Sequence, residues 1–89
     1  MLKVIYVRSF KTDYKKIKNN HQAREAFMAT VDILMTTGTL PDKYLPHSLS
    51  GNYKGYSECH IRPDLLLVYQ IDGDTLILYR IGSHAELFK

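Results

Sequence analysis

Short apolar runs and a helical spacing of apolar residues alternate in the first half of the chain. Residues 2–8 combine β-branched and aromatic side chains, and this composition predicts a strand. Beyond this strand, apolar residues recur at the spacing of a helix: Phe10, Tyr14 and Ile17. A first helix is therefore expected there, with the hydroxyl of Ser9 as its N-terminal cap.

A second, longer helix is predicted after the pair Asn19-Asn20, which interrupts the first helix and offers a new N-cap. Gly38 suits the left-handed position that ends such a helix. The helix should bury five residues that share one stripe: Ala23, Phe27, Thr30, Val31 and Leu34.

The second half of the chain follows the two-residue repeat of strands. Residues 39–50 contain two prolines and are expected to form a loop. Tight turns are predicted at residues 62–64 and 72–74, where Pro and Gly occur. Three strands flank these turns, at about residues 52–61, 65–71 and 75–81.

The chain ends in a short helical turn, because Ser83 and Glu86 match a capping box. The complete order is β-α-α-β-β-β followed by this turn. It predicts an α+β fold in which two N-terminal helices pack on a mainly antiparallel four-stranded sheet. All 89 residues are expected to form a single domain, residues 1–89, because a chain of this length buries one modest core.

Composition excludes several classes of protein. Hydrophobic residues make up 45% and charged residues 24%, which are ordinary values for a globular protein. No apolar run approaches the roughly 20 residues that span a bilayer, and the N-terminal segment lacks the pattern of a signal peptide. No association with a membrane is therefore expected. Cys59 is the only cysteine, so no intramolecular disulfide can form, and a reducing cytoplasm fits the chain best.

Basic residues are concentrated near the N-terminus. The first twenty residues hold six Lys or Arg side chains against Asp13 alone, while the net charge of the whole chain is +3. Three of the lysines should share one face of the first helix: Lys11, Lys15 and Lys18. Such a patch attracts polyanions, of which nucleic acid is the commonest, although a solvated helix face has the same pattern.

Candidate catalytic residues lie mainly in the second half of the chain. The two-residue repeat puts Glu58 and His60 on the same face of one strand. In the last strand it puts Arg80 on the face of Leu78, with Ile81 on the opposite face. If these strands are neighbours, five polar side chains can line one cleft: His47, His60, Asp64, Arg80 and His84.

This set suits the cleavage of an RNA phosphodiester without a metal ion. Histidine can take the proton of the ribose 2′-OH and deliver one to the leaving 5′-oxygen, because its ordinary pKa of about 6.5 lies near working pH. A guanidinium matches the oxygens of the doubly charged phosphoryl group. A carboxylate can act as the base or orient a histidine.

Each of these residues also has a structural alternative. His60 can be a hydrogen-bonded core histidine, and Arg80 can pair with Glu58 across two strands. Asp64 can simply complete the turn after Pro63. Glu58, His60 and Asp64 are also acceptable zinc ligands, but no His-x-x-x-His helix and no cysteine pair accompany them. No metal or other cofactor is therefore expected.

Two segments resemble the YafQ-type toxins of the RelE/ParE superfamily: residues 45–69, LPHSLSGNYKGYSECHIRPDLLLVY, and residues 78–88, LYRIGSHAELF. The resemblance implies a microbial-ribonuclease-like α+β fold and a cytoplasmic toxin of a bacterial type II toxin–antitoxin system. Such a toxin enters the ribosomal A site, cleaves the mRNA there and stops translation. Its partners would be the ribosome, mRNA and a cognate DinJ- or RelB-like antitoxin. The free toxin would be a monomer, and its complex with the antitoxin a hetero-oligomer.

The resemblance also implies roles for the candidate residues. His84 would be the general acid, and Arg80 would stabilise the phosphorane. His60 with Asp64 would act as the base or as a base-orienting pair, and His47 would contact phosphate or assist proton transfer. Substrate contacts would come from five further residues: Lys11, Lys15, Lys18, Lys54 and Phe88.

Two other functions fit parts of the same sequence. A ParE-like toxin directed at DNA gyrase has no need for the histidines at 47, 60 and 84. A non-catalytic nucleic-acid-binding module would depend on the basic first helix and again not on the histidines. The chain also departs from the YafQ pattern at Pro46, Ser57 and Leu65, which leaves its codon preference open.

Overall fold

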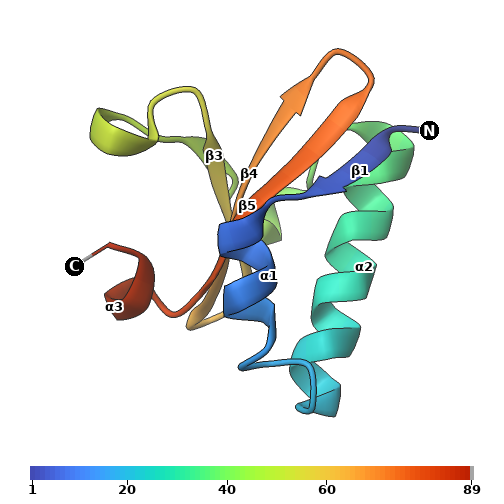
Figure 1. Cartoon of the computed structure of the whole chain (residues 1–89). Helices are drawn as coiled ribbons and strands as arrows, with labels where there is room; N and C mark the ends of the chain where they lie inside the picture. The colour runs from blue at the N-terminus through green and yellow to red at the C-terminus, as the bar shows by residue number, and fades with distance from the viewer. Residues whose placement is uncertain (89) are drawn as a thin grey trace.

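Five strands form one sheet in the order β1-β5-β4-β3-β2, and the computed structural model describes residues 1–88 (Figure 1). The strands are β1 (Lys3–Tyr6), β2 (His47–Ser48), β3 (Ser57–Arg62), β4 (Leu65–Asp72) and β5 (Thr75–Gly82). β1 runs parallel to β5, and every other pairing is antiparallel. The predicted α+β fold is confirmed. The sheet has a fifth strand, β2, within the predicted loop, because two residues are too few to show a repeat.

The helices are α1 (Arg8–Tyr14), α2 (His21–Thr37) and α3 (His84–Leu87), with short 3-10 turns η1 (Asp42–Tyr44) and η2 (Gly51–Tyr53). All five predicted stripe residues of α2 are buried. Its ends also match the prediction, since the Asn20 side chain accepts a hydrogen bond from the Ala23 amide and Gly38 has φ 75°. None of the helices within residues 1–88 is long and apolar enough to cross a membrane.

The first helix differs from the prediction at both ends. It begins at Arg8 without a side-chain cap and ends at Tyr14, so Ile17 lies in the turns that follow it. Ser9 is therefore not the cap. Its hydroxyl donates instead to the carbonyl oxygen of Tyr79 on β5, at 2.7 Å. The hydroxyl thus contributes to tertiary structure rather than to the start of the helix.

Helix α1 completes the outer edge of β5 where β1 ends. The pairing of β1 with β5 stops at Tyr6 and Leu78. Beyond that point the backbone groups of β5 are paired by side chains of α1, namely the Ser9 hydroxyl and the Asp13 carboxylate, which accepts from the Ile81 amide at 3.1 Å. An exposed strand edge is thereby covered and its polar groups are satisfied.

A β-bulge interrupts the alternation of β5. Arg80 is opposite Val68 and Leu78 is opposite Tyr69, so Tyr79 is an extra residue on β5. The expectation that Ile81 faces away from Leu78 is wrong, because both belong to the core beneath the helices. Bulges often turn a side chain toward a site, and this one lies directly before Arg80.

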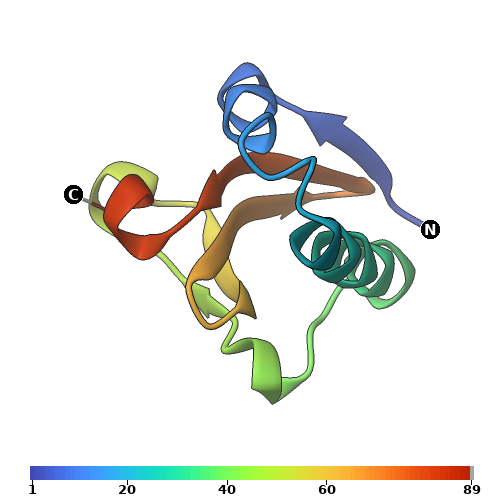
Figure 2. The same ribbon diagram turned by 90° about the horizontal axis from the view of Figure 1, so that it is seen from below.

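Two apolar clusters lie on opposite faces of the sheet. The larger one joins Phe10 and the α2 stripe to strand residues such as Cys59 and Leu67. The smaller one consists of Leu66 and Val68 with Leu87 of α3, and several tyrosines pack against it. Viewed from below, α2 and α3 accordingly lie on opposite sides of the sheet (Figure 2). The candidate site lies on the side of α3.

Candidate active site

Three of the candidate residues lie on one face of the sheet. The strand pairings set His47 opposite Glu58, Glu58 opposite Val68, and Val68 opposite Arg80. Directly paired residues of neighbouring antiparallel strands share a face, so these four form a row across the sheet. His60 lies one pleat further along β3. The register therefore places His47, His60 and Arg80 on one face of the sheet.

Glu58 is a buried carboxylate between two imidazoles. Its side chain is 7% exposed, and its Oε1 lies 3.4 Å from His60 Nε2 and 3.7 Å from His47 Nε2. The other ring nitrogen of His47, Nδ1, is 3.1 Å from the carbonyl oxygen of Leu45. That contact leaves Nε2 of His47 directed at the carboxylate. A buried carboxylate in this place can hold a proton-bearing imidazole or accept a proton itself.

Asp64 has a different partner from the one predicted. The expected pair of His60 with Asp64 is absent, because Asp64 Oδ1 accepts the backbone amide of His84 at 3.2 Å while His60 lies against Glu58. Asp64 thus anchors the first residue of α3. The capping box of α3 is formed as predicted by Ser83 and Glu86. Hydrogen bonds from Ser83, its backbone amide first, lower the pKa of Glu86.

Arg80 is paired with a residue of α1. Its Nε donates to Asp13 Oδ2 at 2.6 Å and its Nη2 donates to Oδ1 at 3.1 Å. The alternative pairing of Arg80 with Glu58 is therefore wrong. The hydrogen bonds to Asp13 raise the pKa of Arg80 further above its ordinary value, although burial opposes this, so the guanidinium keeps its charge.

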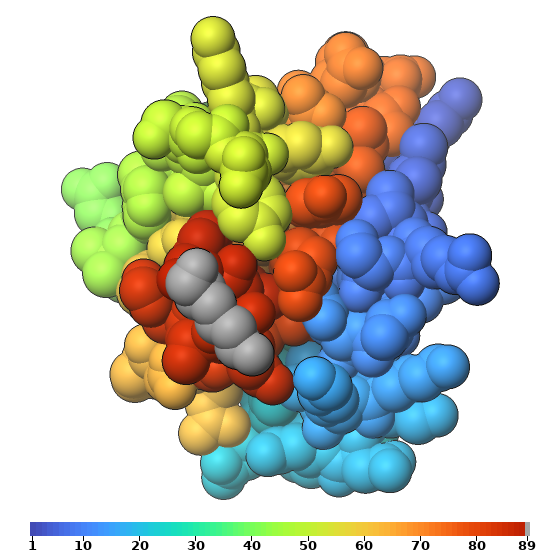
Figure 3. All heavy atoms as spheres, turned by 60° about the vertical axis from the view of Figure 1, so that its left-hand side comes forward, coloured from blue at the N-terminus to red at the C-terminus, as the bar shows by residue number. Residues whose placement is uncertain are grey.

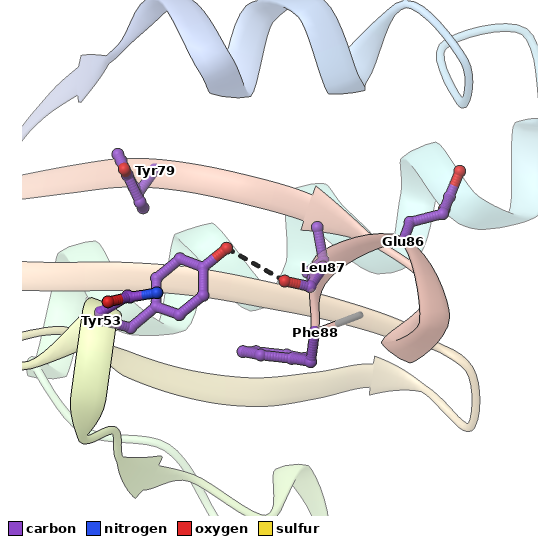
Figure 4. Close-up of a pocket in the computed structure, with 6 residues that line it drawn as sticks. Tyr53, Tyr79, Glu86, Leu87 and Phe88 are labelled. Carbon is purple, nitrogen blue, oxygen red and sulfur yellow. Dashed lines mark hydrogen bonds between the residues drawn. The ribbon is translucent and has the colours of Figure 1, made fainter.

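Aromatic side chains surround a hollow beside α3. The hollow has a volume of about 500 Å³ and is lined by Asn52, Tyr53, Tyr79, Glu86, Leu87 and Phe88 (Figure 4). Tyr53 lies edge-on to Phe88 at 5.3 Å between ring centroids, and its hydroxyl donates to the Leu87 carbonyl at 3.0 Å. The His84 ring is 5.3 Å from that of Phe88. A nucleobase can stack on such a surface.

The space-filling view shows how this face is built (Figure 3). The red α3 lies below the yellow-green loop that carries η2 and beside the blue α1, with the end of β5 between them. The loop, the end of the sheet and the C-terminal helix therefore meet here. The prediction from sequence included Phe88 but neither of the tyrosines that line the hollow, Tyr53 and Tyr79.

Three of the four predicted lysines line a groove of their own. Lys11, Lys15 and Lys18 surround an apolar groove between α1 and α2, together with Tyr6, Phe10, Tyr14, Phe27 and Met28. None of the catalytic candidates lines this groove. Lys54 is exposed directly after η2, near the aromatic hollow. Of the four predicted lysines, Lys54 alone thus neighbours the candidate site.

The described residues include several possible metal ligands and one thiol. Within residues 1–88, no three His, Cys, Asp or Glu side chains are arranged to hold a metal ion. The thiol of Cys59 faces the core, and burial raises its pKa to about 12. Cys59 is consequently a core residue, as the alternation of β3 predicted.

Two functional candidates were missed by the reasoning from sequence. Glu58 was placed on the face of His60, but only as a metal ligand or as a partner of Arg80. The face that Glu58 shares with His60 could have suggested that its carboxylate contacts a histidine. Asp13 carried no signal, because it is one acidic residue in a basic segment and lies 67 positions from Arg80 in the chain.

The chain is similar to known toxins over nearly its whole length. The family model described as "Bacterial toxin of type II toxin-antitoxin system, YafQ" matches residues 2–89. The mRNA interferase toxin YafQ of Escherichia coli K12 is 32% identical over 84 residues, which cover 93% of this chain and 91% of that protein. A solved metal-bound toxin from Helicobacter pylori is 42% identical, with a TM-score of 0.86 over 99% of this chain and 100% of that one. A chain of the E. coli DinJ-YafQ complex is 29% identical, with a TM-score of 0.87 and full coverage of both chains.

Proposed function

The chain belongs to the YafQ family of bacterial toxins of type II toxin–antitoxin systems, and on that premise we propose that it is an endoribonuclease that cleaves mRNA and thereby stops translation. The observation that carries the proposal is the buried Glu58 between His47 and His60, in one row with Arg80. These are the groups that transfer protons and stabilise a phosphorane.

The first half of the reaction is assigned to β3 and its neighbour β2. His60 and Glu58 form the base that takes the proton of the ribose 2′-OH, as the deprotonated oxygen attacks the phosphorus. Glu58 stabilises the imidazolium that forms if His60 takes the proton, because its carboxylate is 3.4 Å away. His47 contacts the same carboxylate from the other side and either shares the proton or binds a phosphate oxygen.

The second half of the reaction is assigned to β5 and α3. Arg80 stabilises the charge of the phosphorane through its N–H groups. His84 delivers a proton to the 5′-oxygen as the P–O bond breaks, and Asp64 holds the start of α3 through the His84 amide. Phe88 stacks on a base at the edge of the aromatic hollow. No step requires a metal ion.

We propose the same partners that the family resemblance implies. Cleavage takes place in the cytoplasm on the ribosome, with Lys54 contacting the RNA close to the site. Lys11, Lys15 and Lys18 contribute electrostatic attraction from a separate surface. A relative forms the DinJ-YafQ complex, and this chain likewise binds a cognate antitoxin. The free toxin is a monomer.

The test is mRNA cleavage in a reconstituted translation reaction, mapped by primer extension with and without ribosomes. Wild type, His84→Ala and His60→Ala are compared with His21→Ala, which removes an exposed histidine of α2. Cuts within codons that need ribosomes, disappear in the first two variants and persist in the third are expected. Cuts on naked RNA would remove the ribosome from the mechanism.

The lysines are tested separately by their dependence on salt. Replacement of Lys11, Lys15 and Lys18 by Gln should weaken binding and flatten its salt dependence, while the rate at saturating substrate stays unchanged. Absence of any cuts by the wild type would favour the gyrase-directed toxin or the non-catalytic binding module. Gyrase inhibition and binding to nucleic acid without cleavage distinguish these two.

A further inference from the structure

The carboxylate of Asp13 accepts three hydrogen bonds from two consecutive residues of β5. Arg80 supplies two of them, at 2.6 Å and 3.1 Å, and the Ile81 amide supplies the third at 3.1 Å. Asp13 is 8% exposed and is one of the few buried polar residues in the described part of the chain. Asp13 is buried, lies on α1 and accepts all three hydrogen bonds from β5. It therefore connects the helix to the strand that carries Arg80.

The geometry determines which edge of the guanidinium Asp13 leaves unoccupied. A guanidinium has five N–H groups, and Asp13 occupies one on Nε and one on Nη2. The edge formed by Nη1 and the remaining N–H of Nη2 is not bonded by Asp13, and Tyr53 is the other side chain that lies close enough to raise the pKa of Arg80. That edge is a fork whose two parallel donors match two oxygens of a phosphoryl group.

The pairing also compensates for the bulge in β5. A bulge makes the strand bend locally and leaves the direction of the next side chain less constrained by the ladder. Arg80 directly follows the extra residue Tyr79. The carboxylate fixes the Arg80 side chain and the Ile81 amide together, so the side chain and the backbone behind it are held by the same group.

We propose that Asp13 is a positioning residue that holds the Nε edge of Arg80, so that the opposite edge of the guanidinium is presented to the scissile phosphate. This inference rests on the proposed ribonuclease function. Asp13 itself does not touch the RNA, and the positive charge that stabilises the phosphorane remains that of Arg80.

The proposal separates the effect on rate from the effect on binding. Asp13→Asn removes a negative charge beside Arg80, so attraction for RNA should be equal or stronger. The guanidinium loses its charged anchor, so its alignment with the phosphorane should be poorer. We expect kcat to fall by roughly 10- to 100-fold, because small misplacements of catalytic groups have effects of that size, while KM stays equal or decreases.

Ser9→Ala is a matched control for the structural role of Asp13. Ser9 lies on the same helix and also bonds the backbone of β5, but its hydroxyl donates to the carbonyl of Tyr79 and not to Arg80. It should lower stability and leave kcat within about twofold of wild type. A double-mutant cycle completes the test, because Asp13→Asn should cause no further loss of rate when Arg80 is already Ala.

Two kinetic results would overturn the proposal. One is an equal loss of kcat in Asp13→Asn and Ser9→Ala at equal loss of stability. The other is the same loss from Asp13→Asn with Arg80 present and with Arg80 replaced. If Asp13→Asn does not fold, Asp13→Glu replaces it, since it keeps the charge but displaces the guanidinium by about one methylene; full kcat in that variant would likewise refute positioning.

An NMR measurement keeps this inference separate from the proposed function. The Arg80 Nε–H resonance should exchange slowly with water in wild type and rapidly in Asp13→Asn, and added inorganic phosphate should shift the guanidinium signals of wild type. If wild type cleaves no RNA, the ribonuclease proposal fails, yet this measurement still decides whether Asp13 holds Arg80. Equal exchange rates in the two proteins would show that it does not.

Discussion

Replacement of Glu58 by Gln isolates the charge of the buried carboxylate from its shape. Gln has nearly the same volume and can still accept a hydrogen bond, so the packing between His47 and His60 is preserved. What is lost is the negative charge, whose Oε1 lies 3.4 Å from His60 Nε2. The proposed mechanism requires that charge, either to stabilise protonated His60 or to accept the proton.

The expected loss of rate follows from that distance. At an effective dielectric constant of about 20–40, a unit charge pair 3.4 Å apart gains roughly 2–5 kcal/mol as His60 takes up its proton. That energy corresponds to a factor of roughly 50 to several thousand in rate. If Glu58 itself is the base, removal of a general base costs a similar factor, roughly 10²–10⁴. We therefore expect Glu58→Gln to cleave about 10²- to 10³-fold more slowly.

Stability should respond quite differently. Glu58→Gln removes a buried charge together with its desolvation cost, so the free energy of unfolding should change by less than about 1 kcal/mol in either direction. The effect on stability can thus be told apart from the effect on cleavage. Urea unfolding measures the free energy of unfolding, and single-turnover cleavage of a defined mRNA on stalled ribosomes measures the rate.

The chain contains a natural control for this experiment. Glu25 lies 3.7 Å from His21 on the exposed surface of α2, which is a second Glu–His pair without the burial. Glu25→Gln should leave the cleavage rate within about twofold of wild type, since exposed pairs contribute little. The reasoning is refuted if Glu58→Gln retains cleavage within about threefold of wild type while both variants are folded.

Three smaller predictions follow from individual contacts. Tyr53→Phe removes the hydrogen bond to the Leu87 carbonyl and should lower the free energy of unfolding by about 1 kcal/mol, measured in urea, while the aromatic ring keeps its stacking surface. Because the pKa of Glu86 is lowered, its hydrogen bonds with Ser83 stabilise the fold above the unfolded pKa of the carboxyl, and this stabilisation is lost as pH falls through the folded pKa. Glu86→Gln should therefore reduce the difference between the free energies of unfolding at pH 7 and pH 3. The thiol of Cys59, with its pKa raised to about 12, should react with iodoacetamide at pH 8 only at the rate of unfolding, and its deprotonation should destabilise the fold as pH rises above the unfolded thiol pKa.

Helix α2 was predictable because its signals are local. Asn20 caps it, Gly38 ends it, and a stripe of apolar residues at helical spacing defines its buried face. The two-residue strand β2 and the bulge of β5 were not predictable in the same way. Both depend on what a neighbouring strand presents, and a single strand's alternation contains no information about its partner.

The candidate site was predicted in its residue types more than in its pairings. The shared face of His60 and Glu58 followed from the alternation of β3, and the capped α3 followed from Ser83 and Glu86. The pairings differ from the prediction, however. Asp64 accepts a hydrogen bond at the start of α3, and Glu58 lies beside His60 where Asp64 was predicted. Which carboxylate pairs with which donor depends on distances in the folded chain, and the sequence does not encode these distances locally.

The shortness of β1 connects the edge of the sheet to the chemistry. β1 pairs with β5 only as far as Leu78, and the chain then turns into α1. A β1 that continued past Tyr6 would have paired more of the outer edge of β5 with backbone. Because β1 stops early, side chains of α1 can reach that edge. The carboxylate of Asp13 accepts the Ile81 amide there and also binds Arg80. A feature that protects the sheet from edge pairing thus fixes the guanidinium, which explains why a buried acidic residue belongs in an otherwise basic segment.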